Sequence, residues 1–377
     1  MSKDNINIAA IVPYKIYPAK MGGQKGIAFF FDHLNRLLPV TIISTNNNIL
    51  PENHAIKIIP LLGHSKLRYI NPLLFFKLRK LIHTTGITHL ILEHPYYGWL
   101  GLLLKWSCRV KLVIHSHNIE GLRFKSLGRW WWGLLLNYEK ITHRKANLNF
   151  FIHDEDREFG IRKFRLEPSR CFTITYGFEL AQAPLPEERI QAKENVCNSY
   201  NFVQEARILL FNGTLDYLPN RKALDIILDR INPMLIANKN LVYRIIICGS
   251  KLPSDYHDLM DYRDKNIIYA GFVEDITLFF KAADIFINPV TDGGGIKTKV
   301  VEALGYNLSV ISTAGGATGI PLNLTGGKLK LIADDNWQEF ADEVVRLDTK
   351  AVIPIDFYRH FYWGWIAERA AVCITNV

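Results

Sequence analysis

Short runs of β-branched and other apolar residues recur along the chain, and most of them precede a longer segment with helical periodicity. Strands that alternate with helices imply parallel sheets covered by helices on both faces. The strands predicted in the first half are Ile6–Val12, Val40–Thr45, His89–Leu92, Lys111–His115, Leu148–Ile152 and Phe172–Thr175. Those predicted in the second half are Arg207–Phe211, Tyr243–Cys248, Ile267–Ala270, Ile285–Asn288, Ser309–Ser312 and Leu329–Ile332. The pattern therefore predicts an α/β protein.

The alternation breaks after Gly177. Residues 178–201 contain Pro184, Pro186 and a polar stretch without a strand pattern, which is typical of a linker. A chain of 377 residues is long enough for two domains. We expect one doubly wound domain over residues 1–178 and a second over 179–354, facing each other across a cleft. Since ligands bind outside the carboxyl ends of such strands, the loops that follow strands are the places to search for chemistry.

Composition and charge narrow the picture. Hydrophobic residues make up 49% of the chain and aromatic residues 12%, which excludes disordered, collagen-like and coiled-coil proteins. The net charge of +9 is unevenly placed: residues 1–180 hold 25 Lys and Arg against 12 Asp and Glu, and the remainder holds 20 against 24. This asymmetry indicates that the first half meets an anionic surface or ligand.

The cysteines and the N-terminal residues bear on the cellular compartment. Five cysteines without a C-x-x-C pair favour a reducing compartment. The opening MSKDNINIAAIVPYK is typical of a first strand and not of a signal peptide. No apolar stretch approaches the roughly 18 to 20 residues of a membrane span. We expect a cytoplasmic protein, with peripheral attachment to the inner face of the plasma membrane as one option.

The most informative segment is TDGGGIKTKVVEALG, residues 291–305, which follows a predicted strand. Consecutive glycines expose backbone N–H groups where a helix begins, and a helix N-terminus carries about half a positive charge. Lys297 and Lys299 in the first turn add formal charge that opposes the helix dipole, so they suit an anionic ligand such as a phosphate better than the helix itself. The alternative is a glycine turn with solvated lysines.

The longer run DIFINPVTDGGGIKTKVVEALGYNLSVISTAGGATGI, residues 284–320, resembles the nucleotide-sugar signature of retaining GT-B glycosyltransferases. The family is the large one of sucrose synthase-like and bacterial polysaccharide and lipid glycosyltransferases (family four, group 1). The resemblance implies an N-terminal acceptor-binding domain and a C-terminal nucleotide-sugar-binding domain, both Rossmann-like. It assigns the donor diphosphate to the glycine loop of Gly293, Gly294 and Gly295, and the ribose hydroxyls to Glu302. Asp292 or backbone amides are the groups expected to hold the donor sugar.

Further motifs follow in the family's order. Ile8–Gly23, with Gly22 and Gly23, resembles the first strand and the glycine loop that approaches donor and acceptor. Residues 173–179 stand at the hinge between the domains, and residues 208–224, with Gly213, resemble the opening of the second domain. The resemblance places Phe272 and Val273 beside the nucleotide base. It also implies that a final helix, at about 355–377, packs back on the first domain.

Two positions depart from the family pattern. Gly294 stands where the family usually has a glutamate, eight residues before the ribose-binding one. The common Arg and Lys after the second domain's first strand are missing: Asn212, Gly213 and Thr214 occupy the turn, and Arg221 and Lys222 stand further along the chain. We expect Lys297 to neutralise the leaving diphosphate.

In the first domain, the segment HSHNIEGLR places His117 just after a predicted strand. A lone histidine is more often structural, but the resemblance assigns this position to the donor sugar near the reacting carbon. His117, Lys297 and Glu302 are thus the expected catalytic residues. The acceptor-side candidates are Glu93, His94, Asn118 and Arg123.

Residues 154–156 imitate the D-x-D metal motif of another glycosyltransferase fold, but their place at the start of a predicted helix fits capping and dipole compensation better. We expect no metal and no cofactor, with the nucleotide-diphosphate sugar as co-substrate.

Two stretches of the first half, residues 66–83 and 123–145, combine aromatic residues, leucines and cations, as helices at a membrane interface do. The alternative is that Trp130–Trp132 are core or interdomain packing. The charge matches no nucleic-acid-binding module, so we expect no nucleic acid partner.

The expected activity is transfer of a sugar from a nucleotide-diphosphate donor to a hydroxyl acceptor, with retention by the resemblance, in the synthesis of a surface polysaccharide or glycolipid. One alternative is a non-catalytic nucleotide-sugar-binding subunit of a glycan assembly complex. Another is a sugar-nucleotide epimerase or hydrolase of the same fold.

Overall fold

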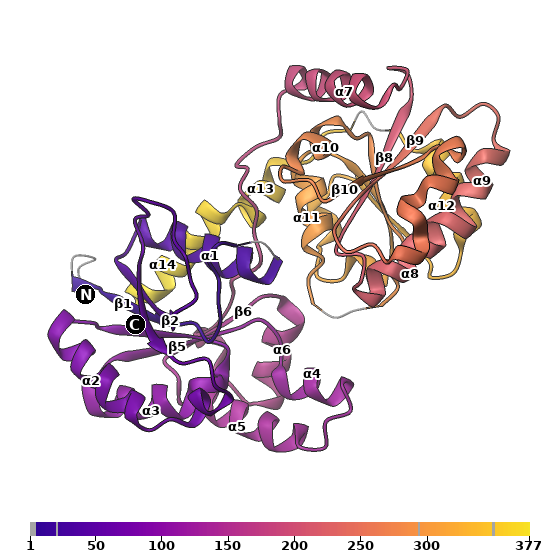
Figure 1. The fold of residues 1–377 in the computed structure, drawn as a ribbon. Coiled ribbons are helices and arrows are strands. Elements are labelled where there is room, and N and C mark those ends of the chain that lie inside the picture. Colours follow the sequence, from indigo (N-terminus) through magenta and orange to yellow (C-terminus); the bar gives the residue numbers. More distant parts are fainter. Residues whose placement is uncertain (1–4, 20–21, 293–294, 349–350) are drawn as a thin grey trace. The chain divides into compact units, whose positions relative to one another are not determined.

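The computed structural model describes residues 5–19, 22–292, 295–348 and 351–377. The chain divides into two compact units (Figure 1). The first comprises Met1–Gly177 together with Phe361–Val377, and the second comprises Phe178–His360. Each unit is built around one parallel sheet, of seven and six strands respectively, with helices beside it. This is the two-domain GT-B type of α/β fold that the sequence predicts.

The sheet of the first unit has the order β3-β2-β1-β4-β5-β6-β7. Its strands are β1 (Ile8–Ile11), β2 (Val40–Thr45), β3 (Lys57–Leu62), β4 (His89–Glu93), β5 (Lys111–Ser116), β6 (Leu148–Phe151) and β7 (Cys171–Thr173). Its helices are α1 (Gly22–Asn35), α2 (Leu73–Thr85), α3 (Gly98–Cys108), α4 (Glu120–Ser126), α5 (Trp132–Lys145), α6 (Asp154–Lys163) and α14 (Trp363–Thr375), with short turns η2 (Lys66–Ile70), η3 (Pro95–Tyr97) and η4 (Pro168–Arg170). Strands β1, β4 and β6 are buried along their whole length, which explains why they have continuous apolar runs and no alternation.

The sheet of the second unit has the order β10-β9-β8-β11-β12-β13. Its strands are β8 (Arg207–Asn212), β9 (Tyr243–Cys248), β10 (Ile267–Gly271), β11 (Ile285–Asn288), β12 (Ser309–Thr313) and β13 (Leu329–Ile332). Its helices are α7 (Pro186–Tyr200), α8 (Leu218–Ile226), η5 (Ile227–Ile231, a π-helix), α9 (Asn232–Ala237), α10 (Thr277–Ala282), α11 (Thr298–Gly305), α12 (Trp337–Arg346) and α13 (Ile355–Phe361), with 3-10 segments η6 (Ser254–Lys265), η7 (Gly315–Ala317) and η8 (Leu322–Leu324).

The structure corrects three expectations. Strand β3 was not predicted, because its sequence KIIPLL contains a proline and only one of its six residues is buried at the sheet edge. The predicted linker contains the 15-residue helix α7, which begins with Pro186 at a position where proline is tolerated. The C-terminal segment is not one helix over 355–377: α13 belongs to the second unit up to His360, and α14 belongs to the first.

Helix α14 packs against α1 within the first unit, and its buried side chains include Trp363 and Ile366. Gly177, the last residue of the unit's main segment, lies against the start of this helix. A Cβ atom there would come within 2.6 Å of the Phe361 carbonyl oxygen and of Ile366 Cδ1. A side chain larger than hydrogen therefore cannot fit at position 177 without displacing the C-terminal segment. In the part of the chain that the structure describes, no helix is long and apolar enough to cross a membrane.

We expect Gly177→Ala to lower the free energy of unfolding of the first unit by about 1–3 kcal/mol, because the added methyl group overpacks a site bounded by backbone. The measurement is urea unfolding followed by tryptophan fluorescence, since seven of the eight tryptophans lie in this unit. The matched control is Gly133→Ala in α5, where a Cβ atom meets nothing within 4 Å. That change should raise stability by about 0.5–1 kcal/mol. Equal effects of the two substitutions would contradict the packing argument.

Candidate functional site

Both sheets have a position where the chain order of the strands reverses. In the first unit it lies between β1 and β4, and in the second between β8 and β11. The loops that leave the carboxyl ends of two such strands run in opposite directions, which leaves space between them for a ligand. The polar side chains of interest gather at these two positions, one in each unit.

In the second unit, a pocket of about 220 Å³ lies at this position. The start of α8 contributes one wall, and the segment that follows β11 contributes the other. The lining residues are Tyr217, Pro219, Asn220, Asn288, Val290, Asp292, Ile296, Lys297, Thr298, Lys299 and Val300. Two of these residues, Lys297 and Lys299, are cations, so the chemistry of the pocket suits an anionic ligand.

Lys299 holds the two walls of the pocket together. Its ammonium group donates to the Asn212 carbonyl oxygen at 2.7 Å and to Asn220 Oδ1 at 2.9 Å. Asn220 in turn donates from Nδ2 to the Thr214 carbonyl oxygen at 2.9 Å. Burial lowers the pKa of Lys299 to about 8, and Glu302 opposes that shift. Burial also lowers the pKa of Lys297.

The same lysine explains why position 213 is glycine. A Cβ atom on Gly213 would lie 2.5 Å from Lys299 Nζ and 2.7 Å from Asn220 Nδ2. The Lys299 ammonium group therefore fits beside the turn after β8 only because position 213 has no side chain. The sequence shows the charge of Lys299 but favours Lys297 for the site, because the partners of Lys299 on and after β8 are not visible in a local motif.

Some of the other residues predicted to bind the donor line the pocket, and others do not. Gly293 and Gly294 lie outside the described residues, and Gly295 has a φ of 76°. Lys297 is the N-cap residue of α11, and Glu302 lies one turn further on, outside the pocket lining. Asp292 lines the pocket, and its carboxylate accepts from Lys222 Nζ at 2.7 Å.

The remaining donor-side candidates lie at other places. Gly22 and Gly23 are the first residues of α1. Phe272 and Val273 follow β10, and the Phe272 side chain is exposed. They do not line the pocket.

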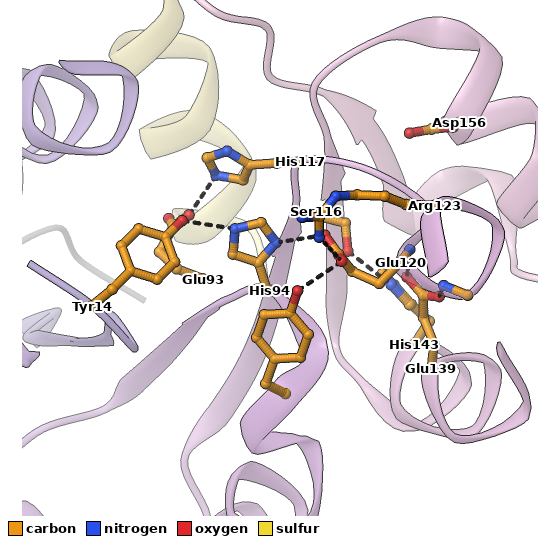
Figure 2. A network of polar contacts seen from close by, with 12 residues as sticks. Tyr14, Glu93, His94, Ser116, His117, Glu120, Arg123, Glu139, His143 and Asp156 are labelled. Atoms are coloured by element: carbon orange, nitrogen blue, oxygen red, sulfur yellow. Dashed lines mark hydrogen bonds and ion pairs between the residues drawn. The ribbon is translucent and has the colours of Figure 1, made fainter. Parts of the chain in front are cut away.

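In the first unit, Glu93 ends β4 and is enclosed by His115 of the neighbouring strand β5 and by His117 of the loop after it. Figure 2 shows Glu93 close to His117. His115 Nδ1 lies 2.8 Å from Glu93 Oε1, and His117 Nε2 lies 2.6 Å from Glu93 Oε2. Glu93 and His115 are buried, and the His117 side chain retains 18% exposure. Glu93 is an acceptor-side candidate by sequence, whereas the structure brings it together with His117.

The charges of this cluster follow from its burial and its hydrogen bonds. Burial alone would raise the pKa of Glu93, but His115 and His117 outweigh it and hold the pKa well below its usual range. Burial and the neighbouring His94 lower the pKa of His117 to about 4. At neutral pH the cluster therefore contains an ionised carboxylate and a neutral His117.

His94 adopts a backbone conformation that is rare for a residue with a side chain, with φ 64° and ψ 156°. This conformation directs the His94 side chain toward Tyr14, which lies in the loop after β1. The Tyr14 hydroxyl lies 2.8 Å from His94 Nε2. On its other side, His94 Nδ1 lies 3.3 Å from Glu120 Oε1. Strained residues of this kind are concentrated at functional sites, where surrounding contacts hold them.

Glu120 accepts hydrogen bonds from the Tyr96 hydroxyl and from Arg123 Nη1, each at 2.7 Å. Arg123, one of the acceptor-side candidates, thus has its charge balanced by a buried carboxylate. Glu139, from α5, accepts from the backbone N–H groups of Glu120 and Gly121 at 3.1 Å and fixes the start of α4. Asn118 lies in the same loop, between β5 and α4.

Among the described residues, the one group with ligand atoms placed for a metal ion is Glu93, His115 and His117, whose atoms lie within 4.8 Å of one another. In the structure both imidazoles use the carboxylate as a hydrogen-bond partner. Residues 154–156 form the first turn of α6, but the N-cap is His153, which accepts from the Asp156 N–H, and not one of the three acidic residues.

Known glycosyltransferase families resemble this chain over both of its units. Residues 22–182 match the family model described as glycosyltransferase family 4, and residues 206–349 match the one described as glycosyl transferases group 1. The two matches fall on the two units in the order that the sequence predicts. The chain belongs to the GT-B glycosyltransferases of this family.

Relatives of this glycosyltransferase are distant. One is chitobiosyldiphosphodolichol beta-mannosyltransferase of Debaryomyces hansenii, 22% identical over 74% of this chain and 64% of that protein. The chain thus spans less than two thirds of this relative's length. Among solved structures, Anabaena HepE in complex with UDP superimposes with a TM-score of 0.72 at 13% identity, over 99% of this chain and 100% of HepE. Sucrose-phosphate synthase from Thermosynechococcus elongatus gives 0.70 at 15%, over 98% of both chains.

The lowered pKa of His117 gives a direct prediction. We expect the imidazole of His117 to titrate with a midpoint near 4, well below the usual histidine pKa of about 6.5. Burial and the neighbouring His94 and His115 favour the neutral ring, and together they outweigh Glu93, which favours the charged ring. The folded state then binds this proton less readily than the unfolded state. The contribution of His117 to the free energy of unfolding should therefore fall as the pH falls from 6.5 to 4.

The measurement is NMR titration of histidine-labelled protein, with the signal assigned by its loss in His117→Gln. A midpoint near 6.5 would show that the ring is solvated and that the enclosed cluster does not exist in solution.

Proposed function

We propose that this protein transfers a sugar from a nucleotide-diphosphate sugar to a hydroxyl acceptor. The observation that carries the proposal is the pocket between β8 and β11, where Lys297 and Lys299 meet the N-terminus of α11. A diphosphate needs cations and N–H donors, and this pocket supplies both. HepE, which shares the fold, was solved with UDP, UDP and glucose, and UDP-glucose.

The chemistry of the transfer assigns a task to each group. The bond between the anomeric carbon and the diphosphate oxygen breaks, and a bond from the acceptor oxygen to that carbon forms. The acceptor proton passes to the leaving phosphate oxygen, and the configuration is retained because attack occurs on the face that the diphosphate leaves. Lys297 and Lys299 stabilise the negative charge that grows on the diphosphate, and cations held in place before the reaction do this without reorganisation.

The acceptor class that we propose is a lipid-linked or growing surface glycan. The mannosyltransferase relative is named for a diphosphodolichol substrate. A second relative, 29% identical over 34% of this chain and 34% of its own length, is an uncharacterised protein in the cps region of Klebsiella pneumoniae. No metal enters the proposed transfer, because the lysines and the backbone N–H groups balance the diphosphate charge.

The test of the function is mass spectrometry of candidate UDP and GDP sugars incubated with and without glycan acceptors. We expect donor consumption that requires an acceptor, and an NMR coupling constant of the product that matches the donor anomer. Lys297→Met should lower kcat/KM about tenfold to a hundredfold, because a charge-assisted hydrogen bond contributes roughly 1.5–3 kcal/mol.

The matched control is Lys239→Met, an exposed lysine of the same unit, which should leave kcat/KM unchanged. Donor consumption without acceptor would indicate a hydrolase or an epimerase. Donor binding without any turnover, unaffected by His117→Ala and Glu302→Ala, would indicate a non-catalytic binding subunit.

We also propose that the first unit binds an anionic membrane surface. Trp130 and Leu134 are 84% and 71% exposed, so they are not core residues, and Trp131 and Trp132 are partly exposed. Lys125 Nζ lies 4.7 Å from the Trp132 ring. A second exposed apolar set lies on η2 and α2: Leu67, Ile70, Leu73 and Phe76. Aromatic residues beside cations on a surface suit the headgroup region of anionic lipids.

Flotation with vesicles of anionic phospholipid tests this surface. We expect co-flotation that declines as salt rises, and an affinity about tenfold lower for Trp130→Ser, because an indole ring contributes roughly 1.5–3 kcal/mol when buried. Leu185→Ser, an exposed apolar residue of the second unit, is the control and should float as the unsubstituted protein does. Equal recovery with neutral vesicles and at high salt would count against the electrostatic account.

A further inference from the structure

The Glu93 carboxylate accepts hydrogen bonds from two imidazoles and is not placed to contact substrate. Its side chain is fully buried, and each carboxylate oxygen faces a different ring nitrogen, Oε1 facing His115 Nδ1 and Oε2 facing His117 Nε2. A carboxylate enclosed in this way has no surface left for a ligand hydroxyl. The acceptor-side role that the sequence suggested for Glu93 therefore does not fit its position.

The direction of these two hydrogen bonds follows from chemistry. An ionised carboxylate has four lone-pair positions and no proton, so it can only accept. Both facing ring nitrogens must then carry the hydrogen. For a neutral imidazole, a hydrogen on one nitrogen leaves a lone pair on the other. His117 is thus the Nε2–H tautomer, with a lone pair on Nδ1.

The second nitrogen of His117 is available. Figure 2 shows it on the side of the ring that faces away from Glu93. Within the described residues no side chain or backbone group forms a hydrogen bond with Nδ1, although the ring is only partly exposed. A lone pair at a partly enclosed, accessible position binds an O–H group and repels a phosphate oxygen.

We propose that Glu93 is a positioning residue, which holds His117 as the Nε2–H tautomer so that Nδ1 accepts a hydrogen bond from a hydroxyl of a bound sugar. The inference rests on the proposed function for the identity of the sugar, but the tautomer itself is a property of the protein alone. It also specifies what His117 does not do: it donates no proton to the leaving diphosphate.

The surroundings keep this geometry in place. His115 is enclosed by aromatic rings, with the centroid of Phe30 at 5.0 Å and that of Phe150 at 6.2 Å. The ring of His94 lies 4.6 Å from that of His117 and opposes a positive charge there. The unusual backbone of His94 places two consecutive side chains, Glu93 and His94, beside the same imidazole. Rotation of His117 would leave the buried Glu93 oxygen without its hydrogen-bond donor, which would lower the stability of the folded protein.

The experiment is long-range ¹H–¹⁵N NMR of histidine-labelled protein near pH 7.5 without substrate, which distinguishes a protonated ring nitrogen from one with a lone pair. We expect His117 to show hydrogen on Nε2 and a lone pair on Nδ1. In Glu93→Gln, one carboxylate oxygen becomes an NH₂ donor, so one of the two histidines must reverse its tautomer or lose its hydrogen bond. The matched control is Glu52→Gln, an exposed acidic residue of the same unit, which should leave the signals unchanged.

Kinetics supply the second readout. With an active donor and acceptor pair, Glu93→Gln should lower kcat about tenfold to a hundredfold, in proportion to one misdirected hydrogen bond, while nucleotide affinity in the second unit stays the same. If Glu93→Gln does not fold, the NMR signal of His117 in the unsubstituted protein still tests the inference. A His117 signal with hydrogen on Nδ1 overturns the inference, whatever the enzyme's activity.

Two other results would also overturn it. Stoichiometric binding of Zn²⁺ alone that shifts His115 and His117 together, and is lost in Glu93→Gln, would make the three residues a metal centre. Wild-type kcat in a folded Glu93→Gln variant would remove the positioning role. Failure to find any donor would refute the proposed function and leave the tautomer result unaffected.

Discussion

Parallel strand pairing is the constraint on which both candidate sites depend. In each sheet all strands run in the same direction, so their carboxyl ends lie along one edge, and the chain order reverses once in the middle. At that reversal two loops run in opposite directions, and polar groups gather between them. Tyr14 and His94 meet because they follow β1 and β4, and Asn220 and Lys299 meet because they follow β8 and β11. The positions of the two sites thus follow from the strand order more than from particular sequence motifs.

Each site also contains a buried charge that the protein stabilises with its own groups. Removing an ion from water costs several kcal/mol unless close partners replace the hydration shell. Glu93 has two imidazole donors, and Lys299 has a carbonyl and an amide oxygen. In both cases the partners come from a neighbouring strand or loop, so the charge connects two segments. Such connections hold catalytic groups at fixed positions before substrate binds, which is what electrostatic stabilisation of a transition state requires.

The errors of the sequence-based expectations have physical causes. Helix α7 lies in the predicted linker because proline is compatible with the first turn of a helix, so Pro186 marks a start and not an interruption. The tryptophans at 130–132 are compatible with either a core or a surface, because aromatic composition does not distinguish the two. Their exposure depends on where α4 and α5 pack, and Gly121 lies against Leu136 at that contact.

By itself, the sequence determined the strand and helix alternation, the division after Gly177 and the presence of a glycine and lysine loop before a helix, because each of these is a local pattern of polarity and backbone freedom. Only the tertiary structure decided that Lys299 reaches the turn after β8, that Glu93 serves His117 and that Arg123 is neutralised by Glu120. In the first two cases the partners are 87 and 24 residues apart, and that separation becomes contact through strand order. In the third the partners are three residues apart, but the burial that strengthens the pair comes from the packing of neighbouring elements. Hydrogen-bond direction and burial depend on such contacts, so no reading of the sequence could assign them.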